Sequence, residues 1–248
     1  MSWGVLLIKR FSFVNMSHFI KSLVIVMLCG FIRCDFSSAQ GIDALFSSAP
    51  KEVLPLLDRT SRLDMLDLYN GGLEAKTENI YGGQSEMLRK THDYIKVRCS
   101  ESSFWQMKLL PVGHDTLIVC VHTLLVPEAV STISFYRHDW HLQKREMPRA
   151  DFSQFVQTNS DLSSYRKQAL MEQMRVQNYQ ASLNDSTTDL TISLDLSSLQ
   201  VSDREDAQRL FHPVAYKWVG GKYVIPTAHP LVEKVSNGAS DVKPHVVR

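Results

Sequence analysis

The segment 91–142 most constrains the fold of this 248-residue chain. It holds four short runs rich in β-branched and aromatic residues, separated by polar residues, glycine and proline. Apolar positions that recur every second residue, interrupted at such short intervals, are typical of β-strands joined by tight turns. A helix would need a period of 3.6 residues, so the segment predicts an antiparallel meander.

The predicted strands cover residues 94–99, 104–110, 116–126 and 133–136. In the first two strands, Ile95, Val97, Cys99, Trp105, Met107 and Leu109 would form the apolar face. Tyr94, Gln106 and Lys108 occupy the alternate positions, and we expect them to face water. The third run is almost continuously apolar, which predicts a central strand covered on both faces.

Helical patterns and further strands surround the meander. We expect helices in residues 50–57, 62–69 with Ser61 as N-cap, 150–156 and 162–174, and a short helix that Ser202 caps and Pro213 ends. In the helix over residues 62–69, Leu63 and Leu66, with Met65 as a further candidate, would face the core. Strand pairs are predicted at 179–183 with 190–196 and at 214–219 with 222–225, the second joined by Gly220-Gly221. The fold class is therefore α+β, an antiparallel β-meander sheet with short helices packed on it.

Two domain divisions fit this order of elements. Residues 42–145 and 146–228 each place helices before strands, which is compatible with two similar halves. No segment rich in glycine, serine or proline separates them, so we favour one domain over residues 40–228. Residues 229–248 lack periodicity and are expected to form a flexible tail.

The N-terminal 39 residues have the three parts of a secretory signal peptide. A basic segment ending at Lys21 precedes an apolar run over residues 22–32, and small residues lead to a cleavage site between Ala39 and Gln40. Met16 is an alternative start. The apolar run is too short to span a bilayer, so we expect a periplasmic or extracellular mature chain without a membrane span. A lipid anchor on Cys29 or Cys34 is the alternative.

The net charge and the cysteine content restrict the partners and the cross-links that we expect. Residues 1–39 hold four of the 27 basic and one of the 26 acidic residues, so the remainder carries 23 and 25, a net charge of −2. This balance argues against a nucleic-acid partner. Cys99 and Cys120 remain after cleavage, on the first and third predicted strands. Alternate strands lie about 10 Å apart, so we favour free buried thiols over a disulfide.

The residues with catalytic chemistry do not form a coherent set. His114 and Asp115, near Ser102 or Ser103, contain the residue types of a serine hydrolase, but no Gly-x-Ser-x-Gly nucleophile motif occurs. His138 and Asp139, with His141, could share a metal only if that segment were helical, whereas the pattern there predicts a polar turn. We therefore expect no metal and no cofactor. The sequence also lacks a glycine-rich phosphate loop.

Several short motifs are spread along most of residues 42–225. They are Ser61-Arg62-Leu63-Asp64-Met65-Leu66-Asp67 with Tyr69, Gly82-Gly83-Gln84-Ser85, Asp93-Tyr94-Ile95-Lys96-Val97, Ser100-Glu101-Ser102-Ser103, Lys108-Leu109-Leu110-Pro111, Phe135-Tyr136 with Trp140, and Tyr216-Lys217-Trp218. In these motifs the chain resembles a family of exported proteins of unknown function from Bacteroidales gut bacteria. The resemblance implies an exported α+β domain and transfers no activity or functional residues.

Two functional hypotheses follow. The first is a non-enzymatic binding or accessory module in the periplasm or at the cell surface, whose partner is a protein or glycan of the envelope. Its predicted contact residues are Tyr94, Tyr136, Trp140, Tyr216 and Trp218. The alternative is a hydrolase with a dispersed Ser/His/Asp-type site, to which His114, Asp115, His138 and Asp139 would contribute.

Overall fold

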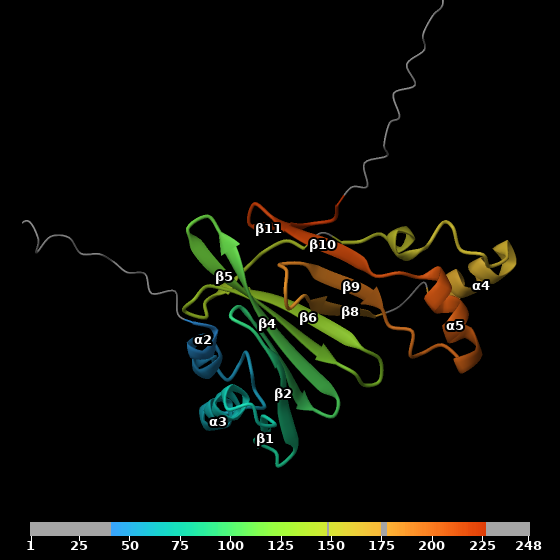
Figure 1. The fold of residues 1–248 in the computed structure, drawn as a ribbon. Coiled ribbons are helices and arrows are strands. Elements are labelled where there is room, and N and C mark those ends of the chain that lie inside the picture. Colours follow the sequence, from blue (N-terminus) through green and yellow to red (C-terminus); the bar gives the residue numbers. More distant parts are fainter. Residues whose placement is uncertain (1–40, 148, 175–177, 227–248) are drawn as a thin grey trace, which may run out of the picture. The chain divides into compact units, whose positions relative to one another are not determined.

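The computed structural model describes residues 41–147, 149–174 and 178–226, which form two antiparallel sheets and a set of short helices (Figure 1). The α+β class predicted from the sequence is confirmed. The predicted signal peptide and the predicted tail at 229–248 lie outside the described residues.

The first sheet has seven strands whose order in space follows the chain. They are β1 (Lys76–Glu78), β2 (Gln84–Lys90), β3 (Tyr94–Ser100), β4 (Ser103–Val112), β5 (Asp115–Leu124), β6 (Val130–Tyr136) and β7 (Leu142–Gln143). The predicted meander is thus confirmed as β3 to β6, and β1, β2 and β7 extend it. β4 and β5 pair from Ser103↔Leu124 to Val112↔Asp115, leaving a two-residue turn. Gly113 in that turn has φ 60°, a conformation that glycine adopts without steric cost.

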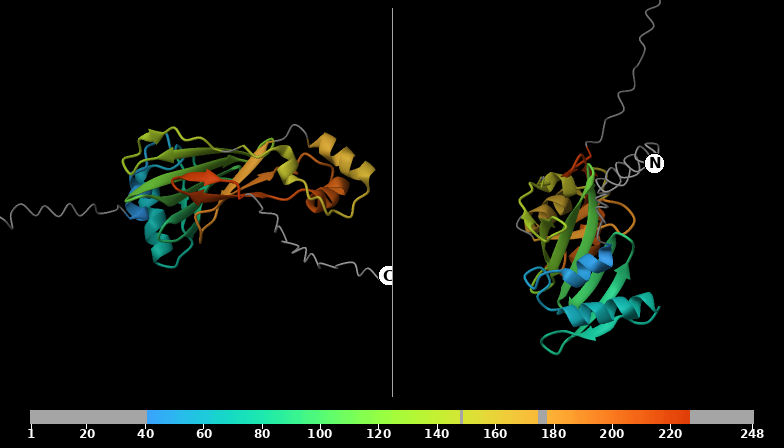
Figure 2. Two further views of the ribbon diagram at one scale, coloured as in Figure 1. Left: turned by 90° about the horizontal axis from the view of Figure 1, so that it is seen from above. Right: turned by 90° about the vertical axis from the view of Figure 1, so that its left-hand side faces the viewer.

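Two helices, α2 (Ile42–Ser48) and α3 (Arg59–Asn70), cover one face of this sheet (Figure 2). The predicted helix over residues 50–57 is wrong: the chain there forms turns, in which the amides of Val53 and Leu54 donate to the carbonyl of Pro50. Ser61 is not the N-cap of α3. That helix begins earlier because Asp58 accepts a hydrogen bond from the Ser61 amide at 2.8 Å.

Arg62 explains why the buried face of α3 differs from the prediction. Its Nη1 donates to the carbonyls of Phe46 and Ala49, at 3.1 and 2.5 Å, and so satisfies acceptors at the end of α2. The guanidinium is consequently buried, whereas Leu63, which we expected in the core, is 39% exposed. Met65 and Leu66 do face the core.

The second sheet is formed by the C-terminal half. Its strands, in the order β11-β10-β9-β8, are β8 (Tyr179–Leu183), β9 (Leu190–Leu194), β10 (Val214–Val219) and β11 (Lys222–Val224). The helical elements are η1 (Phe152–Phe155), α4 (Ser164–Gln173) and α5 (Val201–Leu210). Both predicted hairpins are confirmed, and Gly220 and Gly221 have φ 58° and 83°. The cap predicted at Ser202 is wrong, because α5 starts at Val201 with Gln200 as N-cap.

The seven-stranded sheet separates two hydrophobic cores. Trp105, Met107 and Ile118 face α2 and α3, and the Trp105 ring lies 5.9 Å from that of Phe46. Alternate residues such as Val119 and Val121 face the second sheet and its helices. The seven-stranded sheet therefore contributes side chains to both cores. The halves are not similar modules, since one sheet has seven strands and the other four.

The expectation that Tyr94, Gln106 and Lys108 face water is wrong, because β8 lies across β4, β5 and β6 on that face. All three side chains are at most 3% exposed. Cys99 and Cys120 are free and buried on β3 and β5, on either side of β4.

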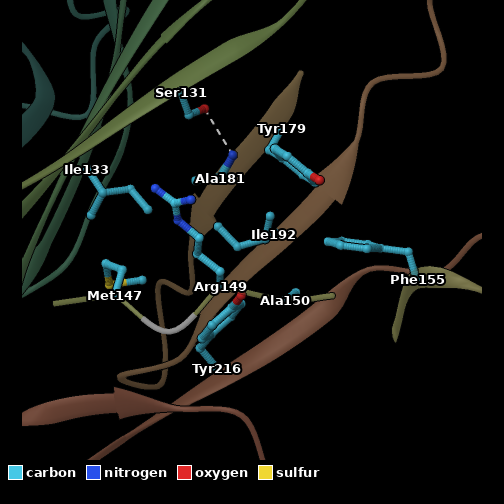
Figure 3. A pocket seen from close by; sticks show the side chains of 10 residues that line it. All are labelled: Ser131, Ile133, Met147, Arg149, Ala150, Phe155, Tyr179, Ala181, Ile192 and Tyr216. Carbon is cyan, nitrogen blue, oxygen red and sulfur yellow. Dashed lines mark hydrogen bonds between the residues drawn. The ribbon is translucent and has the colours of Figure 1, made fainter. Parts of the chain in front are cut away.

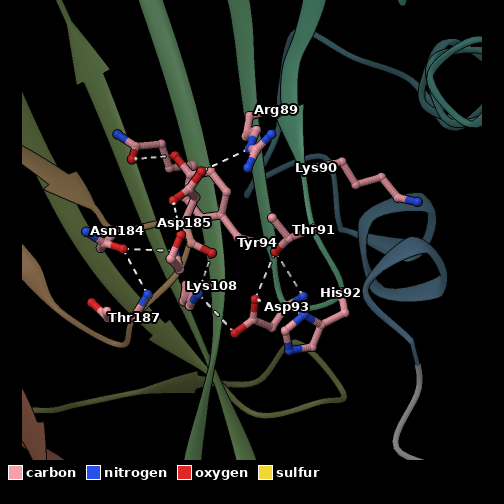
Figure 4. Close-up of polar contacts among 12 residues, drawn as sticks. Arg89, Lys90, Thr91, His92, Asp93, Tyr94, Lys108, Asn184, Asp185 and Thr187 are labelled. Carbon is pink, nitrogen blue, oxygen red and sulfur yellow. Dashed lines mark hydrogen bonds and ion pairs between the residues drawn. The ribbon is translucent and has the colours of Figure 1, made fainter. Parts of the chain in front are cut away.

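A polar network fastens the β8–β9 hairpin to this covered face (Figure 4). Lys108 Nζ lies 2.9 Å from Asp93 Oδ2 and donates to the carbonyl of Asp185 at 3.1 Å. Arg89 Nε pairs with the Asp185 carboxylate at 2.9 Å. Gln106 Oε1 accepts from the Tyr94 hydroxyl at 3.1 Å and from the Leu183 amide at 3.0 Å. The buried side chains of this network, Tyr94, Gln106 and Lys108, thus each have a polar partner, as burial requires.

Candidate functional site: a cleft between the two sheets

A cleft of about 530 Å³ opens between β6 and the second sheet. Its lining residues are Ser131, Ile133, Met147, Arg149, Ala150, Phe155, Tyr179, Ala181, Ile192 and Tyr216. They come from β6, β8, β9, β10, η1 and the connection that joins the two halves (Figure 3). The volume lies within the range of about 300–1,000 Å³ typical of small-molecule sites.

Hydrogen bonds between the sheets hold two walls of the cleft together. The Ala181 amide on β8 donates to Ser131 Oγ on β6 at 2.9 Å, and Ser131 Oγ also lies 2.7 Å from Thr123 Oγ1 on β5. At the same end of β6, just before the strand begins, the Ala129 amide donates to Asp195 Oδ2 at 2.6 Å. The bond from Ala181 to Ser131 joins the two sheets, so the packing of the sheets fixes the position of these walls.

Aromatic rings form one side of the cleft. Tyr216 is 2% exposed, and its burial raises the pKa of its hydroxyl, an effect partly offset by a hydrogen bond from the Ala150 backbone. The rings of Phe155 and Tyr179 are tilted against each other with their centroids 5.6 Å apart. Tyr179 is 42% exposed and stands nearest the solvent. Flat apolar groups can stack on an exposed ring such as that of Tyr179.

Arg149 brings the charge to this cleft. Figure 3 shows its side chain crossing the cleft toward Ile133 and Ala181, with Ile192 alongside. The described lining residues include one cation and no carboxylate, imidazole or thiol. Within the described part of the chain, the Arg149 guanidinium makes no ion pair, in contrast to Arg166 on α4, which pairs with Asp203 and Asp206.

Asp115 and His138, both predicted site residues, line a second hollow of about 430 Å³. Its other lining residues are Val112, Thr116, Leu117, Arg137, Gln143 and Arg145. His114 and Asp139 are exposed beside it, and Asp139 Oδ2 lies 3.2 Å from His141 Nδ1. Across the described ranges, no group of three or more His, Cys, Asp or Glu residues is placed to hold a metal ion.

The serines considered for hydrolysis lie far from His114. Ser103 begins β4, whereas His114 stands two residues after Val112, the last residue of that strand. A ten-residue strand rising ~3.3 Å per residue separates them by about 30 Å. Ser102 precedes Ser103 and is no closer, so the fold does not assemble a serine, histidine and aspartate here.

The predicted contact aromatics lie in four different places. Tyr216 lines the cleft, whereas Tyr94 is in the core. Trp218 packs on Tyr223 with centroids 4.9 Å apart, and its Nε1 donates to the carbonyl of Pro111 at 2.8 Å. Tyr136 and Trp140 pack against each other at 5.5 Å, beside the core formed with α2 and α3.

Sequence reasoning did not identify Arg149 or the isoleucines of the cleft. Arg149 lies in the irregular connection between the halves, where no periodic pattern of apolar residues indicates which way a side chain faces. Ile133 and Ile192 were predicted strand residues, but nothing local indicates that they face each other across two sheets. For Tyr179 the sequence offers one indication of its place near the site: it stands at the start of a predicted strand.

The architecture defines a class: a two-sheet α+β domain with an apolar cleft between the sheets. A domain of an uncharacterized protein from Porphyromonas gingivalis W83 has a similar fold, with a TM-score of 0.60 and 24% sequence identity over 75% of this chain and 97% of that one. The chain belongs to the family described as "Protein of unknown function (DUF3256)", whose model matches residues 36–223. The family resemblance predicted from the sequence motifs is thus confirmed.

No curated protein matches the chain. Among the helices that the structure describes, none is long and apolar enough to cross a bilayer.

Proposed function

We propose that the protein is a non-enzymatic binding module of the periplasm or cell surface, and that the cleft between its sheets is the binding site. The observation that carries this proposal is the cleft itself, which is mostly apolar, contains a few polar groups and is framed by inter-sheet hydrogen bonds. Concave sites of this composition and size are typical of ligand binding.

The chemistry of the lining supports binding. Ile133, Ile192 and Met147 offer apolar surface, which favours a ligand through burial, while Arg149 and Tyr216 offer hydrogen-bond donors that would orient it. Of the predicted contact residues, Tyr216 is the one that lies in this cleft.

The cellular location proposed here depends on the predicted signal peptide. We expect mass spectrometry of the protein isolated from its own bacterium to find the N-terminus at or near Gln40. An intact N-terminus, or a diacylated cysteine, would contradict cleavage between Ala39 and Gln40.

The binding site can be tested with protein carrying labelled isoleucine methyl groups. Ile133 and Ile192 line the cleft, whereas Ile80 is on the surface and Ile95 is buried in the opposite core. We expect compounds from a chemically diverse library, which includes envelope oligosaccharides and short peptides, to shift the Ile133 and Ile192 signals. Ile80 and Ile95 should remain unaffected.

A substitution that fills the cleft provides the matched test. Ile192→Trp should abolish these shifts, and Ile80→Trp, which places the same side chain at an exposed position, should leave them intact. Circular dichroism and thermal unfolding would verify that both variants are folded. Binding that survives Ile192→Trp in folded protein, or a library without a single compound that shifts Ile133 and Ile192, would overturn the proposal.

A further inference from the structure

We infer that the cleft selects a carboxylate attached to a flat apolar body, with Arg149 as the residue that determines this specificity. The inference rests on the proposed function and adds the chemical class of the ligand.

Arg149 is exposed, and its positive charge has no counter-ion among the described residues. A bound anion would therefore gain a charge-assisted hydrogen bond with the guanidinium. Arg145 and Arg89, by contrast, already have acceptors: Arg145 donates to the carbonyl of Gly221 at 2.6 Å, and Arg89 pairs with Asp185. Arg149 is directed into a cleft whose described lining holds no carboxylate.

Two sets of hydrogen-bond donors face the cleft. The planar guanidinium presents parallel N–H groups that match the two oxygens of a carboxylate. The Tyr216 hydroxyl, which accepts from the Ala150 backbone, retains its own O–H for donation, and Figure 3 shows it beside Ala150 at the edge of the cleft. An anionic head group between Arg149 and Tyr216 would thus meet donors from two directions.

The remaining lining is apolar. Tyr179, which packs on the buried ring of Phe155, supplies an exposed ring, and Ile133, Met147 and Ile192 supply aliphatic surface. These groups would cover a flat apolar body and leave its charged end at Arg149. A highly charged or fully hydroxylated ligand would leave this surface without a complementary partner.

Three probes of nearly equal shape separate charge from fit: 2-naphthoate, 2-naphthalenesulfonate and the neutral 2-naphthamide. We expect 2-naphthoate to bind at least about tenfold more tightly than 2-naphthamide, the ratio that one charge-assisted hydrogen-bonded pair supplies. Titration of the Ile133 and Ile192 methyl signals would measure the affinities and verify that the probes occupy the cleft.

Arg149→Gln should remove the preference for 2-naphthoate while the affinity for 2-naphthamide stays within about twofold. Arg149→Lys should retain part of the preference, because a lysine keeps the charge without the paired donors. Arg59→Gln, at an exposed position on α3, is the control and should change neither affinity.

The outcomes separate the inference from the proposed function. Equal binding of 2-naphthoate and 2-naphthamide in the cleft, a preference that survives Arg149→Gln, or tenfold tighter binding of the sulfonate would overturn the inference and leave the binding site in place. The inference would also fail if library compounds shift Ile133 and Ile192 but none of the three probes does. If no compound of any kind does so, both proposals fail.

Discussion

Lys108 Nζ and Asp93 Oδ2 lie 2.9 Å apart on the face of the first sheet that the second sheet covers. The lysine is 1% exposed, whereas the side chain of Asp93 retains 22% of its accessible surface. The same ammonium reaches the carbonyl of Asp185 in the β8–β9 turn. One charged group therefore joins the meander to the C-terminal hairpin.

We expect Lys108→Met to destabilise the fold by about 2–4 kcal/mol. Removing one partner of a buried pair costs about 3–5 kcal/mol, and the partial exposure of Asp93 reduces this figure. The substitution also leaves the Asp185 carbonyl without this donor. Urea unfolding at pH 7 measures the change.

Arg98→Met is the control for that substitution. Arg98 pairs with Glu86 at 3.2 Å, but its side chain is 45% exposed, so we expect a loss below about 1 kcal/mol. Similar losses for Lys108→Met and Arg98→Met would contradict the structural role assigned to Lys108.

Asp195→Ala should cost about 1–3 kcal/mol at pH 7. Its carboxylate accepts from the Ala129 amide, and from the amide and hydroxyl of Ser197 at 3.0 and 2.7 Å. Asp161→Ala, which removes an exposed ion pair with Arg209, is the control and should cost less than about 1 kcal/mol.

The cost of Asp195→Ala should also depend on pH. Burial by itself would raise the pKa of Asp195, but the hydrogen bonds from Ser197 and Ala129 outweigh it and hold the pKa below its usual value. The carboxylate therefore stabilises the fold above the pKa that it has in the unfolded chain, about 3.9, and this contribution is lost as the pH falls through the lower folded value. In unfolding curves, the difference in stability between wild type and variant should be similar at pH 7 and pH 5 and smaller at pH 3.5; a difference that stays constant down to pH 3.5 would disprove the assignment.

His122 on β5 predicts a second pH effect. Burial lowers the pKa of its imidazole, so the unfolded chain binds this proton more readily than the folded one. Stability from His122 is thus complete above its unfolded pKa, about 6.5, and declines as the pH falls through the folded value. His122→Gln should flatten the loss of stability between pH 7.5 and 5.5, whereas His92→Gln, at a side chain that is 91% exposed, should not. Identical slopes for wild type and His122→Gln would argue against this effect.

The thiols of Cys99 and Cys120 should resist alkylation in the folded protein. Burial raises the pKa of Cys99 to about 12 and that of Cys120 well above its ordinary value, so the reactive thiolate is scarce at pH 8. We expect iodoacetamide to label both at least about 100-fold more slowly than in guanidinium chloride. Peptide mass spectrometry reads each cysteine separately, and rapid labelling of either one in native protein would refute the prediction.

The meander could be predicted because its signal is local. Between Ile95 and Phe135, apolar and polar residues alternate in short runs, and these runs define β3 to β6 without reference to the rest of the chain. Gly113 and Gly220-Gly221 indicate turns because glycine readily adopts positive φ. Helix starts were less certain, since Asp58 and Ser61 are both competent caps three residues apart and the fold uses the first.

The covered face and the cleft could not be predicted in this way. Gln106 and Lys108 look solvent-facing because their partners, Leu183 and Asp185, are 77 residues away along the chain. Arg149 sits in a segment without regular structure, and its neighbours Ile133 and Ile192 become neighbours only when the second sheet docks. The architecture is encoded by short-range pattern, whereas the site arises from packing.

The side-chain bonds to β8 have a consequence for how copies of this chain meet each other. β8 is an edge strand of its sheet. The unpaired backbone amides of an exposed edge strand can pair with a strand of another molecule, which leads to aggregation or to domain swapping. The outward amides of Ala181 and Leu183 are already engaged by Ser131 and Gln106. Two residues of the first sheet thus occupy amides of this edge strand that would otherwise be free to pair with another copy of the chain.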